Sequence, residues 1–158
     1  MKKIPISRHS HYALVDDDNY DELSKYKWFD MAGYAVRQVY EKGSGRNNRK
    51  VRTIRMHRLI LGFPDGTIDH IDGNRCNNQK SNLRVCSSGE NALNAKVRTD
   101  NTSGFKNVLW NKQKQKWQVR LNVDGRPRHC GFYNFLEEAI GAAYTFRLFY
   151  HKDFARHE

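Results

Sequence analysis

Residues 68–96 read IDHIDGNRCNNQKSNLRVCSSGENALNAK, and this stretch decides the fold at the centre of the chain. Residues 68–71 predict a short strand, which the turn-forming Asp, Gly and Asn at 72–74 bring to an end. A polar loop leads to a second predicted strand at 83–86. A serine then supplies a good N-cap for a helix at 87–97. The predicted order is therefore strand, loop, strand and helix.

Four polar residues stand at fixed places in this pattern. Asp69 and His70 close the first predicted strand, Asn82 lies twelve residues after His70, and Asn91 lies twenty-one residues after it, near the start of the helix. Taken singly, an Asp-His pair is most often a turn or a surface pair, and either asparagine fits a loop or a solvated helical turn. Only their joint occurrence at a family's spacing points to a catalytic site.

Residues 56–94 resemble the ββα-metal core of HNH endonucleases, and closely the phage and intron-encoded HNH homing enzymes. The segments DHIDGN, NN, SNLR and EN follow that family's order and spacing. The resemblance implies an α+β fold, with a β-rich N-terminal region ahead of a central ββα-metal (HNH, His-Me finger) core. It assigns residues 1–96 to one domain and the core to about 55–96.

The resemblance gives each of the four residues a role. His70 corresponds to the general base, because a neutral imidazole has a pKa near the working pH and can take a proton from water. Asn82 corresponds to the central asparagine, which holds the active-site loop or the histidine in place. Asp69 and Asn91 correspond to metal ligands, where a hard cation can bind the scissile phosphate and stabilise the leaving oxygen.

Neighbouring residues have less specific expectations. Asn74, Asn77 and Asn78 are expected to shape the loop and to contact phosphate. His57 lies in the segment Met-His-Arg-Leu, which is common ahead of HNH cores, and we interpret it as structural or phosphate-facing and not as the base.

One divalent cation is the expected cofactor. Two oxygen ligands, completed by phosphate oxygens and waters, suit Mg²⁺, with Mn²⁺ as the alternative. A catalytic zinc site would favour several His or Cys ligands. The three cysteines, Cys76, Cys86 and Cys130, form no C-x-x-C pair, so we expect reduced thiols and no structural zinc.

The 158 residues carry a formal net charge of +11, which favours a polyanionic partner. Residues 1–60 hold 13 Lys/Arg against 7 Asp/Glu and residues 101–158 hold 10 against 5, whereas residues 61–100 are balanced. The densest basic run, 42–58, is either a solvated loop or, as we favour, a segment that follows DNA phosphates. The residues expected to contact DNA there are Arg49, Lys50, Arg52, Arg55 and Arg58.

The C-terminal region has the clearest strand pattern. Apolar residues alternate with polar ones over 117–123, which predicts a half-buried strand. Asp124-Gly125 predicts a two-residue hairpin turn into a returning strand at 126–133, and a first strand is expected at 105–111. The three strands would form an antiparallel sheet.

A helix is expected to cover this sheet. Asn134 begins a capping-box pattern, and apolar residues recur on one helical face from there to about His151. Residues 97–103 are polar and unpatterned and predict a linker. The C-terminal domain is therefore expected at 104–158, with three antiparallel strands packed on one helix.

Residues 103–155 resemble the plant APETALA-type, or ethylene-response-factor, DNA-binding domain through the segments GFKNV, KWQVRL, GFY and LEEAIGAAYTFRL. That family reads the major groove with the exposed face of its sheet, where arginine can pair with guanine and lysine can hold phosphate. Leu109 and Asn111 depart from the pattern, since arginines often stand there. The resemblance implies DNA contacts from Lys106, Trp110, Arg120, Arg126 and Arg128.

Together these features predict a metal-dependent endonuclease that hydrolyses DNA phosphodiester bonds, a site-specific nicking or homing-type HNH enzyme. The alternative is a catalytically inactive DNA-binding regulator built on the same modules. An RNA-directed nuclease or binder is the third possibility, but the sequence contains no RNA-binding signature motif.

Double-stranded DNA is the expected partner, with no protein partner. No apolar stretch is long enough to span a bilayer, and the N-terminus lacks the apolar segment of a signal peptide. We therefore expect a cytoplasmic protein in a bacterial host, encoded by a phage or an intron.

Overall fold

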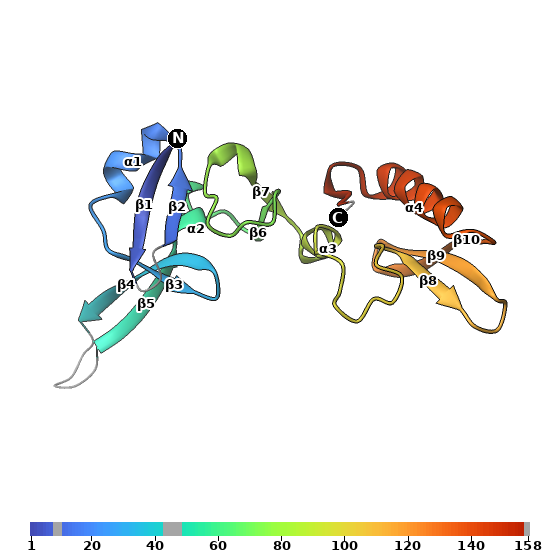
Figure 1. The fold of residues 1–158 in the computed structure, drawn as a ribbon. Coiled ribbons are helices and arrows are strands. Elements are labelled where there is room, and N and C mark those ends of the chain that lie inside the picture. The colour runs from blue at the N-terminus through green and yellow to red at the C-terminus, as the bar shows by residue number, and fades with distance from the viewer. Residues whose placement is uncertain (8–10, 43–48, 157–158) are drawn as a thin grey trace. The chain divides into compact units, whose positions relative to one another are not determined.

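The computed structural model describes residues 1–7, 11–42 and 49–156, and the chain divides into two units, Met1–Cys86 and Ser87–Glu158. Each unit combines β-sheet with helices, which confirms the expected α+β class (Figure 1). The division falls ahead of the expected linker at 97–103.

The first unit is built on a five-stranded sheet with the strand order β2-β1-β3-β4-β5. Strands β1 and β3 are parallel, and the other neighbouring pairs are antiparallel. The N-terminal region is β-rich, as expected, and the parallel pairing of β1 with β3 joins two local hairpins, β1-β2 and β3-β4. The strands are β1 (Lys2–Ser7), β2 (His11–Val15), β3 (Trp28–Met31), β4 (Tyr34–Lys42) and β5 (Arg49–Arg55).

Alternating apolar residues of β1 and β2 form the core of this unit together with Trp28 and with residues of α1 (Asp17–Leu23) and α2 (Met56–Ile60). The indole N–H of Trp28 donates to the carbonyl of Leu23 at 2.8 Å and so ties α1 to β3. Asp17 and Asp18 lie in the first turn of α1, where acidic residues suit the positive end of the helix dipole.

A two-stranded antiparallel sheet follows, formed by β6 (Thr67–His70) and β7 (Leu83–Cys86). A 3-10 turn, η1 (Lys80–Asn82), leads into β7. The loop between the strands is anchored on β2, because Leu14 N–H donates to the carbonyl of Cys76 and Asn78 N–H donates to that of Leu14, both at 2.8 Å. The expected strand, loop and strand are confirmed.

The second unit begins with α3 (Ser88–Leu93), which ends earlier than the sequence predicted. A capping box starts it, since Glu90 N–H donates to Ser87 Oγ and the Glu90 carboxylate accepts from Ser87 N–H. At its other end, Lys106 Nζ donates to the carbonyls of Leu93 and Ala95. These bonds fasten α3 to the C-terminal region, which explains why the chain divides before α3.

The rest of this unit is a three-stranded antiparallel sheet with the order β10-β9-β8, and α4 runs along one of its faces (Figure 1). The expected strands and helix are confirmed. The N-cap of α4 is Phe135, whose N–H donates to Glu138, and not Asn134. The elements are β8 (Val108–Asn111), β9 (Lys116–Val123), β10 (Arg126–Tyr133), α4 (Leu136–His151) and η2 (Lys152–Phe154).

Valine and leucine side chains of β8 and β9 pack against two alanines of α4 to form the second core. The alternation over 117–123 therefore has the predicted cause, a strand with one face turned to a helix. Among the described residues, no helix is both long and apolar enough to cross a membrane.

Candidate active site

His70 is the last residue of β6, and its side chain is buried, with 4% of the residue exposed. The ring makes an edge-on contact with His57 at a centroid distance of 5.2 Å, and Tyr34 lies 6.0 Å away. Nε2 lies 3.4 Å from Oδ1 of Asn78. Burial lowers the pKa of His70, although the Asn78 hydrogen bond and nearby carboxylates oppose the shift. The imidazole is therefore neutral at neutral pH, as a general base must be.

His57 lies in α2 and is 5% exposed. Burial, followed by the nearness of His70 and two arginines, lowers the pKa of His57 to about 4. Its ring packs against Tyr34 at a centroid distance of 5.2 Å. The structural interpretation of His57 therefore agrees with its position, because its neutral ring packs against that of His70.

Asn82 fastens the loop that follows His70. Its Oδ1 accepts from Asp72 N–H at 3.0 Å, and its Nδ2 donates to Asp72 Oδ1 at 2.9 Å and to the carbonyl of Asn77 at 2.8 Å. Its backbone carbonyl accepts from Ile71 N–H. Of the two tasks foreseen for Asn82, these bonds favour holding the loop over holding the histidine.

Asp72 is the hub of this loop, and its importance was not foreseen. Burial alone would raise the pKa of the carboxyl group, but hydrogen bonds from Asn77, Asn74 and Asn82 bring it below its usual range. An ionised carboxylate therefore gathers three asparagines around it. The signal in the sequence was the density of asparagines after Asp72, because each offers donors to a carboxylate.

Asp69 lies in the same strand as His70 and is 6% exposed. It pairs across the hairpin with Arg84, and Arg84 Nη2 and Nε lie 2.6 and 2.9 Å from Asp69 Oδ2. The described residues contain no group of three or more His, Cys, Asp or Glu that could hold a metal. A single buried carboxylate suits a hard cation that keeps much of its own shell of phosphate oxygens and waters, such as Mg²⁺, and does not suit zinc.

Asn91 lies in α3, half-buried, and its N–H donates to the carbonyl of Ser87. It belongs to the second unit, whereas Asp69 belongs to the first. Their joint use as metal ligands therefore remains a prediction from the sequence.

The basic residues predicted to contact DNA in the first unit divide into two groups. Lys50, Arg52 and Arg55 are exposed on β5. Arg58 instead donates from Nη1 to the carbonyl of Gly66 at 3.1 Å and from Nη2 to that of Pro64, and so supports the turn before β6. Arg49 opens β5, and its side chain lies outside the described part of the structure.

The register of the C-terminal hairpin separates its three arginines. Arg120 lies between the buried Val119 and Leu121, so its side chain is on the outer face, away from α4. Arg126 pairs with Val123 and Arg128 pairs with Leu121, which puts both on the helix side of the sheet. The outer face of the sheet therefore holds Arg120, whereas Arg126 and Arg128 lie on the helix side. The two-residue turn at Asp124-Gly125 fixes this register, so the sequence already contained the information.

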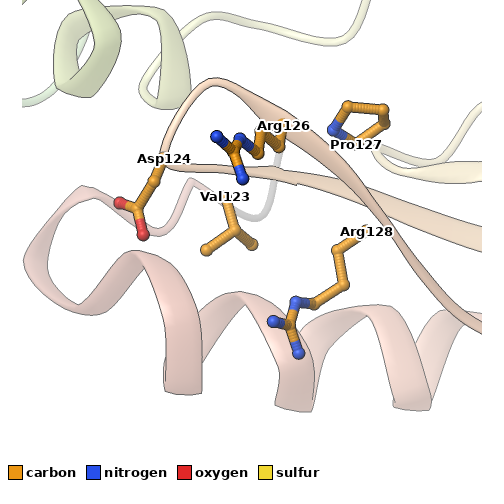
Figure 2. Close-up of a pocket in the computed structure, with 5 residues that line it drawn as sticks. All are labelled: Val123, Asp124, Arg126, Pro127 and Arg128. Atoms are coloured by element: carbon orange, nitrogen blue, oxygen red, sulfur yellow. The ribbon is translucent and has the colours of Figure 1, made fainter.

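Figure 2 shows Arg126 and Arg128 with Asp124 around a pocket at the end of this hairpin, with Arg128 reaching toward α4. Arg128 Nη1 donates to the hydroxyl of Tyr150 at 3.0 Å, and the guanidinium lies 4.9 Å from that ring. The side chain thus packs on Tyr150 at the protein surface.

The last two residues predicted to contact DNA also have internal partners. Trp110 packs edge-on against Trp117 at a centroid distance of 5.0 Å, and 37% of it is exposed. Lys106 holds the end of α3, and burial, followed by nearby Arg147 and Arg156, lowers the pKa of its amine to about 8. Lys106 therefore caps the C-terminal end of α3 by donating to two carbonyl groups there.

Comparison with known proteins assigns a family to the central part of the chain. Residues 56–93 match the HNH_3 family, described as HNH endonuclease, and the resemblance of 103–155 to APETALA-type domains remains a prediction. The chain is 36% identical over 89 residues to Protein 3.8 of Escherichia phage T7, covering 56% of this chain and 73% of that protein.

It is also 34% identical over 104 residues to an uncharacterized HNH endonuclease of Acanthamoeba polyphaga mimivirus, covering 65% of this chain and 53% of that protein, so it spans about half the length of that relative. No solved structure shows a significant similarity. The chain therefore belongs to the same family as Protein 3.8 of phage T7 and carries an HNH endonuclease domain at residues 56–93.

Proposed function

We propose that this protein is a divalent-metal-dependent DNA endonuclease in which His70 takes the proton of the attacking water. The observation that carries the proposal is a buried, neutral His70 at the end of β6, beside the carboxylate of Asp69 and within the matched HNH domain. Phosphodiester hydrolysis needs a proton acceptor with a pKa near or below the working pH, and this imidazole meets the requirement.

The other HNH residues support His70. Asn82 and Asp72 keep the loop after His70 closed through reciprocal hydrogen bonds, so the imidazole is held on a rigid support. Asp69 and Asn91 are the residues that would hold Mg²⁺ or Mn²⁺, which when bound supplies positive charge at the scissile phosphate and the leaving oxygen. Arg84 keeps the Asp69 carboxylate oriented across the hairpin.

Double-stranded DNA would lie along two basic surfaces, each described within its own unit. In the first, exposed Lys50, Arg52 and Arg55 of β5 would contact phosphates. In the second, the outer sheet face offers Arg120 and the Gln118–His129 pair, whose side-chain nitrogens lie 3.2 Å apart. Lys106, Trp110, Arg126 and Arg128 stay predicted DNA contacts of the APETALA-like module, with Arg126 and Arg128 exposed on the helix side of the sheet.

A single HNH domain in the chain favours cleavage of one strand per encounter. We therefore propose a site-specific nicking enzyme of the homing type, acting in the cytoplasm of a bacterial host, as its similarity to a phage protein supports.

The test is relaxation of supercoiled plasmid. Wild type with Mg²⁺ should give nicked circles with ligatable 5′-phosphate ends, and EDTA or His70→Ala should abolish them. His11→Ala is the matched control, because His11 is exposed on β2, and it should cut like wild type. Binding without cleavage on several DNAs, with Mn²⁺ as well, would favour a DNA-binding regulator. Full activity of His70→Ala would show that His70 is not the base.

A further inference from the structure

We propose that Asn78 is a positioning residue for His70: its side-chain oxygen accepts a hydrogen bond from Nε2–H of His70 and so makes Nδ1 the atom that takes the proton. The consequence for cleavage rests on the proposed nuclease function. The tautomer of His70 is a property of the protein alone and can be measured without any reaction.

Asn78 is held in place by its backbone and almost completely buried, with 1% of the residue exposed. Its N–H donates to the carbonyl of Leu14, beside a parallel bridge between Leu14 and Asn77. A buried amide is costly unless its polar atoms are paired, so its side chain needs defined partners. The structure offers two, a backbone carbonyl and the imidazole of His70.

The backbone carbonyl decides which way the amide faces. Asn78 Nδ2 lies 3.2 Å from the carbonyl oxygen of Cys76. Because that oxygen can only accept, the amide must turn its NH₂ group toward it and its Oδ1 toward His70. Oδ1 lies 3.4 Å from His70 Nε2 and can also only accept, so Nε2 must carry the hydrogen. A neutral imidazole has one N–H, and therefore Nδ1 keeps the lone pair.

The aromatic neighbours limit rotation of the ring. His57 meets the His70 ring at an interplanar angle of 89°, and Tyr34 packs against both histidines. These contacts restrict the plane of the imidazole, whereas the Asn78 oxygen selects between its two nitrogens. The selection matters because a base in the wrong tautomer presents N–H to the water.

Asn77 provides the matched control. It lies in the same loop, but its Nδ2 donates to Asp72 Oδ2 at 2.8 Å and its Oδ1 accepts from Gln79 N–H. The Asn77→Leu change therefore loosens the loop without removing the acceptor that faces Nε2. Asn78→Leu removes that acceptor at similar size, and Asn78→Asp restores an oxygen there.

The first measurement is the tautomer, by two-bond ¹⁵N–¹H correlation spectra of the histidine rings at neutral pH, with the His70 signals assigned by their loss in His70→Ala. Wild type, Asn77→Leu and Asn78→Asp should show the Nε2–H form, whereas Asn78→Leu should show a mixture. A wild-type ring in the Nδ1–H form, or an unchanged tautomer in folded Asn78→Leu, would overturn the proposal.

The second measurement is single-turnover nicking. Asn78→Leu should lower the maximal single-turnover rate constant about 10- to 100-fold, as loss of a partner that orients a site residue commonly does, with the concentration that gives half of this rate changed less than about twofold. Asn78→Asp should recover most of the rate. Equal losses in Asn78→Leu and Asn78→Asp would overturn the positioning role. An Nε2–H tautomer in a protein that cuts no DNA would support Asn78 and overturn only the nuclease function.

Discussion

The loop that follows β6 and the C-terminal sheet use polar residues in opposite ways. In the loop, Asn78 bonds to His70 and to the carbonyl of Cys76, and Asn82 bonds to Asp72 and to the carbonyl of Asn77. On the sheet, Arg120 faces outward, and Arg128 donates a hydrogen bond to the hydroxyl of Tyr150 in α4. Buried polar networks are retained at a cost in desolvation, so they mark a site that needs fixed geometry, whereas exposed cations tolerate replacement. Replacing a single residue should therefore reduce stability or cleavage rate more in the loop than on the sheet.

The largest effect is expected from His70→Ala. Removal of a general base typically lowers the cleavage rate about 10²- to 10⁴-fold, whereas DNA binding should stay close to that of wild type. Plasmid nicking rates and gel-shift titrations measure the two quantities. A loss of DNA binding as large as the loss of cleavage rate would mean that His70 contacts DNA. The loop and the sheet would then no longer differ in function.

The second effect is a dependence of stability on pH that originates at His57. Its pKa is lowered from 6.5 to about 4 by burial, so the unfolded chain binds more protons between those values. Its contribution is therefore complete above pH 6.5 and is lost as the pH falls toward 4, by about 3 kcal/mol. Urea unfolding at pH 7 and pH 4.5 measures it, and the difference should shrink in His57→Phe. An equal pH dependence in both proteins would contradict the role of burial.

The third effect is expected from Asn82→Ala, which removes the acceptor of the Asp72 N–H and the donor to the carbonyl of Asn77. An unpaired buried polar group costs about 1–3 kcal/mol, and the free energy of unfolding from urea titration should fall by that amount. Asn111→Ala is the control, because its side chain bonds to Gln118 at 3.3 Å on the C-terminal sheet. A larger loss for Asn111→Ala would reverse the comparison.

The smallest effect is expected on the sheet itself. Arg120→Ala should weaken DNA binding a few-fold and reduce the salt slope of log K by about one, if Arg120 contacts a phosphate. Arg128→Ala should change the slope less, because its guanidinium is directed to Tyr150. Fluorescence anisotropy over a range of salt concentrations measures both, and a larger slope change for Arg128→Ala would place DNA on the other side of the sheet.

Local patterns predicted much of the fold. The alternation over 117–123 and the Asp-Gly turn were enough for β9 and β10, because period two and turn chemistry act over a few residues. The parallel pairing of β1 with β3 was not predicted, since it joins segments that β2 and α1 separate in the sequence, whereas each strand also pairs with its neighbour along the chain. The register of the hairpin, which the two-residue turn fixes, puts Arg126 and Arg128 on the helix side of the sheet.

The candidate site shows the same division. The spacing of Asp69, His70 and Asn82 was sufficient to place them on a hairpin and its loop, since strand, turn and cap signals are local. The sequence alone also determined the basic charge and the HNH pattern. Only the tertiary structure decided that Asn78 faces His70 and that Lys106 clamps a helix. Such partners follow from how distant segments pack and which buried polar atoms must be paired, and no local pattern encodes that choice.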